Sequence, residues 1–83
     1  MPRFYFDTFN GSLWVGDPEG IECPDVEAAM ELAKVAMSDM AHDELPGGEG
    51  LTIMVRIRDQ ADRTVAEAEL DMRSQYVRRR SGS

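Results

Sequence analysis

Four short segments have the composition or alternation of β-strands, with aromatic and β-branched residues that suit a pleated surface. They are residues 3–9, 12–16, 51–58 and 63–70. Asn10-Gly11 separates the first two and predicts a two-residue hairpin turn in which both residues adopt positive φ. Residues 59–62 separate the other two and predict a four-residue turn opened by Asp59 and closed by Asp62 in the left-handed region.

One longer segment, from about Asp25 to Leu45, has the periodicity of an amphipathic helix. Its hydrophobic positions recur at helical spacing: Val26, Ala29, Met30, Ala33, Ala36, Met37 and Met40. Asp25 is suited to cap the first free N–H groups, and Pro46-Gly47-Gly48 ends the pattern. Before the helix, Asp17-Pro18-Glu19-Gly20 fits a type I turn.

These elements predict an α+β fold: a single small ββαββ domain, in which two hairpins form a four-stranded antiparallel sheet and the helix packs on one face. We place the domain at residues 1–72. Residues 73–83 have no usable periodicity and are expected to form a basic, mobile tail, with Tyr76 or Val77 as an anchor.

The expected turns set a register for each hairpin. A two-residue turn pairs Phe9 with Ser12 and Phe6 with Val15, and a four-residue turn pairs Ile57 with Thr64. The helix-facing side of the sheet then holds one set of residues: Phe4, Phe6, Thr8, Leu13, Val15, Ile53, Val55 and Ile57. The opposite, outer side holds another: Tyr5, Asp7, Phe9, Ser12, Trp14, Met54, Arg56 and Val65.

Three of the six aromatic residues therefore point away from the helix. Exposed clusters of aromatic residues and arginine are typical of protein interfaces. The candidate partner-binding residues are Tyr5, Phe9, Trp14, Met54 and Arg56. Two other interpretations stay open: the aromatics stabilise the hairpin by cross-strand pairing, or the tail folds back over them through Tyr76.

The domain expected at 1–72 and the tail expected at 73–83 also differ in the sign of their net charge. The net charge is −7, and four of the nine basic residues but none of the 16 acidic ones lie at 73–83. The first 72 residues thus carry −11 and the tail +4. Arg78, Arg79 and Arg80 predict at most weak, salt-sensitive nucleic-acid binding. The alternative is a solvated tail, and the acidic body favours solubility.

The residues of common catalytic and metal sites are sparse. Cys23 and His42 are the only residues of their types, and they flank the expected helix, about 28 Å apart at 1.5 Å per residue, too far for a nucleophile and base. Asp17, Glu19 and Glu22 match a calcium loop poorly. We predict no enzyme activity, no cofactor and no metal. Without a disulfide pair, a signal peptide or a membrane span, the expected location is the cytoplasm.

The string MPRFYF and the segment DPEGIECPDVEAA at 17–29 resemble a family of small bacterial proteins of unknown function. Members open with M-P-R/x-Y/F-F-F, then have a D-x-E-G turn, L-P-D before the helix and a closing hairpin with D-x-x-G-R. The resemblance covers residues 1–71. Here Cys23 stands where the family has Leu, and Asp62 where it has Gly. It implies a compact ββαββ domain with no assigned activity and no catalytic residues.

Together these features predict a non-enzymatic module, a dimer or partner-binding protein, that makes its contacts through the outer aromatic face. An alternative comes from Gly16-Asp17 and Glu27-Ala28-Ala29, which follow a hairpin as in antitoxin domains of the HicB type. That resemblance implies a sheet-and-helix unit that binds a small toxin.

Overall fold

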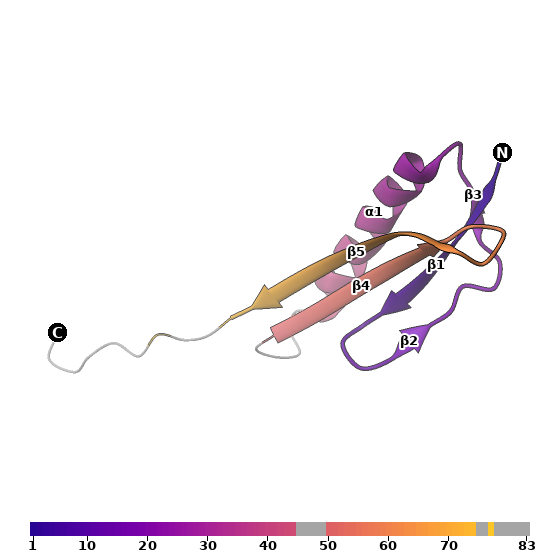
Figure 1. Cartoon of the computed structure of the whole chain (residues 1–83). Coiled ribbons are helices and arrows are strands. Elements are labelled where there is room, and N and C mark those ends of the chain that lie inside the picture. The colour runs from indigo at the N-terminus through magenta and orange to yellow at the C-terminus, as the bar shows by residue number, and fades with distance from the viewer. Residues whose placement is uncertain (45–49, 75–76, 78–83) are drawn as a thin grey trace, which may run out of the picture.

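The computed structural model describes residues 1–44, 50–74 and 77 (Figure 1). The elements along the chain are β1 (Arg3–Phe9), β2 (Trp14–Val15), β3 (Ile21–Glu22), α1 (Val26–Glu44), β4 (Gly50–Arg58) and β5 (Thr64–Arg73). All strand pairs are antiparallel, and α1 lies on one face of the sheet, behind it in Figure 1. The α+β class is confirmed.

The sheet has five strands and not the four expected. Its order is β2-β1-β4-β5, and β3 also pairs with β1. The extra strand was missed because it has two residues only, Ile21 and Glu22, which pair with Phe4 and Arg3 at the start of β1. The segment expected as a strand over 12–16 pairs only through Trp14 and Val15.

The Asp17 side chain bridges the gap between β2 and β3 along the edge of β1. One carboxylate oxygen accepts the Phe6 N–H at 3.1 Å. The other accepts the N–H groups of Glu19 and Gly20, which holds the expected bend at 17–20. Gly20 has a φ of 70°, and a Cβ there would lie 2.8 Å from the Phe4 carbonyl oxygen. A side chain at position 20 would therefore push β3 away from β1.

The first hairpin has a four-residue loop, so the expected two-residue turn and the pairing of Phe9 with Ser12 are wrong. Phe9 pairs with Trp14 and Thr8 with Val15. In the loop only Gly11 has positive φ, while the Asn10 side chain accepts the N–H groups of Ser12 and Leu13. Asn10 thus serves as a side-chain cap of the loop. Because the register error is two residues, Phe9, Trp14 and Val15 keep their expected faces, whereas Ser12 and Leu13, which were expected in the strand, lie in the loop.

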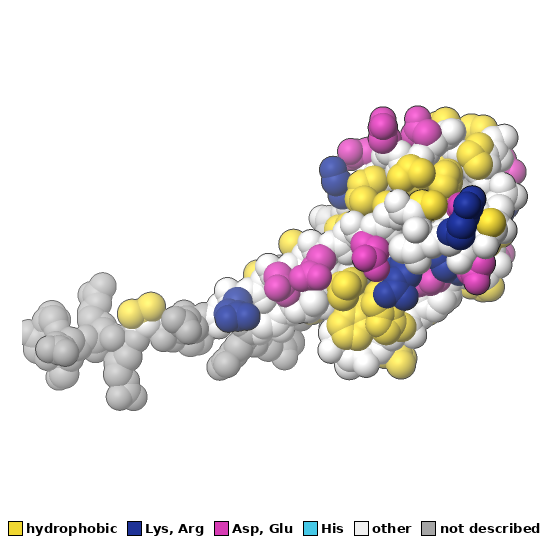
Figure 2. Space-filling view, in the orientation of Figure 1, with side chains coloured by type: hydrophobic (Ala, Val, Ile, Leu, Met, Phe, Trp, Pro, Cys, Tyr) yellow, Lys and Arg dark blue, Asp and Glu magenta, His cyan; other side chains and the backbone are white. Residues whose placement is uncertain are grey.

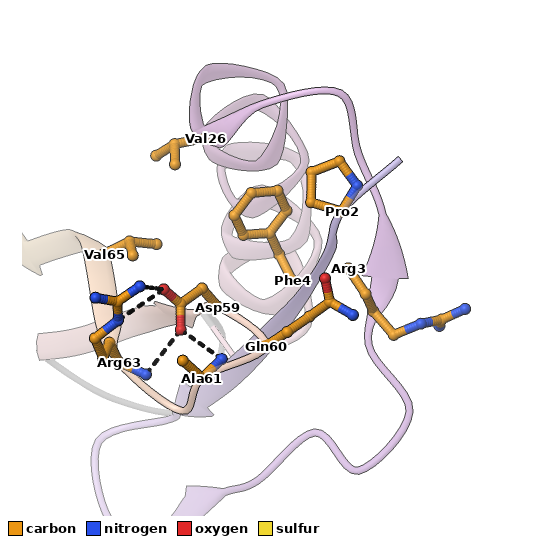
Figure 3. A pocket seen from close by; sticks show the side chains of 9 residues that line it. All are labelled: Pro2, Arg3, Phe4, Val26, Asp59, Gln60, Ala61, Arg63 and Val65. Carbon is orange, nitrogen blue, oxygen red and sulfur yellow. Dashed lines mark hydrogen bonds and ion pairs between the residues drawn. The ribbon is translucent and has the colours of Figure 1, made fainter.

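The second hairpin also differs by two residues over most of its length. Ile57 pairs with Ala66 and not with Thr64, whereas Arg58 does pair with Thr64. Val65 is the extra residue of a bulge between these pairs. The bulge turns Val65 to the helix side, beside Phe4 and Val26 (Figure 3), so its expected place on the outer face is wrong.

The core lies between α1 and the inner face of the sheet, where its buried strand residues belong to β1 and β4. Asp25 caps the helix as expected, accepting the Ala28 N–H at 2.8 Å. The buried residues are Phe4, Cys23, Ala29, Ala33, Met37, Ile53, Val55 and Ile57. Small residues on the helix and on β5, such as Ala33 and Ala68, allow close packing. The helix lies over β4 and β5, and Val15 on the inner face of β2 stays 54% exposed.

Candidate interaction surface on the outer face of the sheet

The five predicted partner-binding residues all lie on the face of the sheet opposite α1, but the structure divides them between its two ends. Phe9 and Met54 are directly opposite each other on β1 and β4, and Trp14 is opposite Phe9 on β2. Arg56 joins them from β4. Tyr5 lies further along β1, opposite Arg58. We call Phe9, Trp14, Met54 and Arg56 the aromatic patch.

Trp14 is the centre of the aromatic patch. Its ring centroid is 5.3 Å from that of Phe9, with a tilt of 36° between the planes. The guanidinium carbon of Arg56 lies over the Trp14 ring, 4.6 Å from its centroid. Trp14 remains 40% exposed. Figure 2 shows this hydrophobic group at the β1–β2 end of the outer face. An exposed cation–π contact contributes about 0.5–1 kcal/mol.

Arg56 also forms an ion pair with a residue of the neighbouring strand β5. Its Nε donates to Oε2 of Glu67 on β5 at 3.1 Å, and both side chains are about half exposed. An exposed pair of this kind contributes at most about 1 kcal/mol. The guanidinium therefore has a preferred position but is not fixed in it.

A second cluster, not found by sequence reasoning, occupies the other end of the outer face. Arg58 binds Asp7 through two bonds, Nε to Oδ2 at 2.7 Å and Nη2 to Oδ1 at 3.0 Å. Its Nη1 donates to Asp62 at 2.7 Å and its Nη2 to the Asp17 carbonyl at 3.3 Å. The guanidinium carbon lies 5.1 Å from the Tyr5 ring centroid. We call Tyr5, Asp7, Asp17, Arg58 and Asp62 the arginine cluster.

Electrostatics follow from this geometry. The bidentate bond from Arg58 holds the pKa of Asp7 below its ordinary value, against the opposing effect of burial, and the Asp17 N–H adds to the lowering. The hydrogen bonds that Arg58 donates to Asp7 and, to a smaller extent, to Asp62 raise the pKa of Arg58. Both groups are therefore charged at neutral pH. The only sequence signal for the cluster was Asp7, a carboxylate among aromatics in the middle of a strand.

A shallow hollow of about 400 Å³ lies on the helix side, at the tip of the second hairpin (Figure 3). Its apolar lining includes Phe4, Val26 and Val65. Asp59 is engaged with its own loop, since its carboxylate accepts from Ala61, from Arg63 and from the Arg63 guanidinium. The N–H of Arg63 and then that of Ala61 lower the pKa of Asp59. These bonds fix the turn.

The remaining sequence predictions concern chemistry. Cys23 is buried, and His42 is exposed near the far end of α1. Among residues 1–44, 50–74 and 77, no group of three or more metal-ligating side chains comes together. No helix in this described part is long and apolar enough to cross a membrane. Arg78, Arg79 and Arg80 lie outside the described residues.

Comparison with known families gives one match, over residues 3–71, to a domain of unknown function (DUF6894). The chain belongs to that family, in agreement with the resemblance of its N-terminal and turn motifs. No curated protein and no solved structure matches. The antitoxin-like alternative is not tested by these comparisons and stays a prediction.

Proposed function

We propose that this chain is a small interaction module that binds another protein, or a second copy of itself, through the aromatic patch. The observation that carries this proposal is the 40% exposed Trp14, whose ring packs against that of Phe9 and carries the Arg56 guanidinium on its face. Tryptophan and arginine dominate the binding energy of protein interfaces. A tryptophan already held in place loses little conformational entropy when a partner covers it.

The position of the patch also supports this role. Its side chains come from three neighbouring strands, β1, β2 and β4, so the sheet holds them in fixed relation. None of them belongs to the buried core. Interface residues can therefore change without loss of the fold, which is the property expected of a binding surface on a stable scaffold.

We infer that the role is not enzymatic. Cys23 is 2% exposed and lies just before α1, whereas His42 lies in the last turn of the helix. On the outer face, Arg56 and Arg58 are engaged in ion pairs with Glu67, Asp7 and Asp62. A free cysteine fits a reducing compartment, and we propose the cytoplasm as the location.

The test is a comparison of two variants of β2. Trp14→Ser removes the centre of the patch, and Val15→Ser changes the neighbouring residue, which is also exposed but lies on the opposite face of the same strand. We expect quantitative affinity capture from host extract to give a set of proteins retained by the parent and by Val15→Ser and lost with Trp14→Ser. Truncation of a central interface tryptophan typically costs about 2 kcal/mol, or about thirtyfold in affinity.

Circular dichroism and thermal unfolding serve as the control on folding. Trp14→Ser should remain folded because Trp14 is outside the core. Equal retention of the same proteins by the two variants would overturn the proposal. Loss of the folded state in Trp14→Ser would show that the tryptophan is there to stabilise the hairpin.

A further inference from the structure

β5 is a long edge strand with one free side. It pairs with β4 along one side, and among the described strands none pairs with its other side. It spans ten residues, Thr64–Arg73, where a typical strand has about five or six. From Ala66 onward its register with β4 is regular, because the bulge lies before that residue. Every second residue of such a strand directs its N–H and C=O groups to the free edge.

The usual obstacles to strand pairing are missing from this edge. Proteins protect exposed edges with proline, bulges or charged residues that point inward. From Ala66 to Met72 the sequence contains no Pro or Gly, and the residues on the inner face are all apolar. Ala66 and Ala68 pack against the core, while Leu70 and Met72 are 36% and 39% exposed. What remains as an obstacle is charge on the outer face.

That charge is a row of exposed acidic residues on the outer face: Glu67, Glu69 and Asp71. Figure 2 shows the row along the strand. Glu67 pairs with Arg56 of β4. Within the described part of the chain, no basic side chain forms an ion pair with Glu69 or Asp71. Arg73, the next residue on this face, ends the row, so the negative charge is centred on Glu69.

The acidic row disfavours a second copy of this strand as the partner. Symmetric antiparallel pairing of two β5 edges about any residue from Glu67 to Asp71 places at least one acid opposite another acid, which is unfavourable. A strand with lysine or arginine on its outer face would instead place a base opposite each acid. Apolar residues at its alternate positions would lie beside Ala68 and Leu70 on the inner face.

We propose that the free edge of β5, centred on Glu69, binds an extended segment of another protein in which basic and apolar residues alternate. The segment forms main-chain hydrogen bonds with β5. Its basic side chains lie beside Glu67, Glu69 and Asp71, and its apolar side chains extend the inner layer of the sheet past Leu70. In strand addition of this kind, main-chain bonds supply affinity and alternate side chains supply specificity.

This inference concerns a different surface from the aromatic patch and stands or falls without it. Trp14 belongs to β2, whereas β5 is at the opposite end of the strand order β2-β1-β4-β5. Trp14→Ser is therefore expected to leave binding at the β5 edge unchanged. Failure of one proposal can thus be distinguished from failure of the other.

The test is binding of an acetylated and amidated peptide of alternating lysine and valine, measured by fluorescence anisotropy with the full chain. A block peptide of the same composition, with all lysines before all valines, has the same charge but cannot direct its lysines to one face of a strand. It should bind at least about fivefold more weakly. A peptide of alternating glutamate and valine should bind more weakly still, because it repeats the charge of the edge.

Charge reversal on β5 tests the position of the site. Glu69→Lys should weaken binding of the lysine–valine peptide at least about fivefold and should strengthen binding of the glutamate–valine peptide. Asp39→Lys makes the same change of charge on the exposed side of α1 and should leave both affinities within about twofold of the parent. Both side chains are exposed, so both variants should unfold near the parent temperature, which serves as the control on folding.

Amide hydrogen exchange separates strand pairing from charge attraction alone. Alternate amides between Ala66 and Met72 should exchange at least about tenfold more slowly when the lysine–valine peptide is bound. Binding without this protection would overturn the proposal. So would no binding up to about 1 mM peptide, equal binding of the alternating and block peptides, or equal losses in Glu69→Lys and Asp39→Lys.

Discussion

Arg56 and Arg58 lie two residues apart on the same strand and the same face, yet they have opposite environments. Arg58 is bound by two oxygens of Asp7, by Asp62 and by the Asp17 carbonyl, and 24% of its side chain is exposed. Arg56 has one exposed ion pair and rests on the Trp14 ring. One arginine ties strands and loops together, and the other covers an aromatic residue that solvent still reaches.

The difference divides the outer face into a structural end and an end that is free to bind. The arginine cluster joins β1, the loop after β2, β4 and the second hairpin turn, so its loss would loosen several elements at once. The aromatic patch lies on β1 and β4, which pair with other strands along their length, and on the short edge strand β2, which pairs only with β1. Four predictions separate the two ends, in order of decreasing effect on stability.

Removing the guanidinium of Arg58 should have the largest effect. Arg58→Ala leaves the Asp7 carboxylate without its cation in a site that is 16% exposed, and we expect the free energy of unfolding to fall by about 2–3 kcal/mol. Arg58→Lys keeps the charge but loses the bidentate bond to Asp7. Its free energy of unfolding should therefore lie between those of the parent and of Arg58→Ala. Urea denaturation measures both, and an alanine variant as stable as the parent would contradict a structural role.

Substitution of Asp62 should have the next largest effect on stability. Its φ of 64° is the only positive value among the described non-glycine residues, as the turn predicted. Asp62→Val should destabilise by about 1–2 kcal/mol because a β-branched residue fits the left-handed region poorly. Asp62→Gly relieves strain but loses the bond from Arg58, so we expect little net change by thermal unfolding. Equal stability of the valine and glycine variants would be incompatible with this account.

Acid should remove the contribution of Asp7. Because the folded-state pKa of Asp7 is lowered from 3.8, its ionised form stabilises the fold fully above about pH 4–5, and this stability is lost as pH falls through the folded pKa. The difference in unfolding free energy between the parent and Asp7→Asn should therefore be large at pH 7 and shrink below about pH 4. A difference that stays constant with pH would exclude the ion pair as its source.

Arg56→Ala should change stability least. It removes an exposed ion pair worth at most about 1 kcal/mol and an exposed cation–π contact worth about 0.5–1 kcal/mol, so the loss stays below about 2 kcal/mol. Thermal unfolding should therefore place Arg56→Ala closer to the parent than Arg58→Ala. If Arg56→Ala proved the more destabilising of the two, the division of the outer face would be reversed.

The faces of the sheet were predictable from the sequence, but the contacts within them were not. Both registers differ by an even number of residues, so Phe9 and Trp14 keep the same face even though their direct pairing was missed. Val65 was misplaced because a bulge adds one residue, an odd shift that reverses the face. Turn chemistry at Asn10 depends on its side-chain bonds, which the dipeptide pattern does not specify.

The two arginines show where sequence reasoning ends. Arg56 and Arg58 occupy equivalent positions in the alternation of one strand, and only Arg56 was expected to contact a partner. Two of the groups that fix Arg58 are far away along the chain, 51 residues for Asp7 and 41 for the Asp17 carbonyl. Strand order brings them together, and strand order follows from the whole fold and not from any local pattern.

The most direct test of this division is affinity capture with Arg56→Ala, quantified against the parent and matched for folded protein. The account predicts that Arg56→Ala unfolds at nearly the parent temperature. It also predicts that the captured amount of the partner proteins that Trp14→Ser loses falls at least tenfold with Arg56→Ala. Full retention of those proteins by a folded Arg56→Ala would contradict the assignment of the aromatic patch as the binding surface.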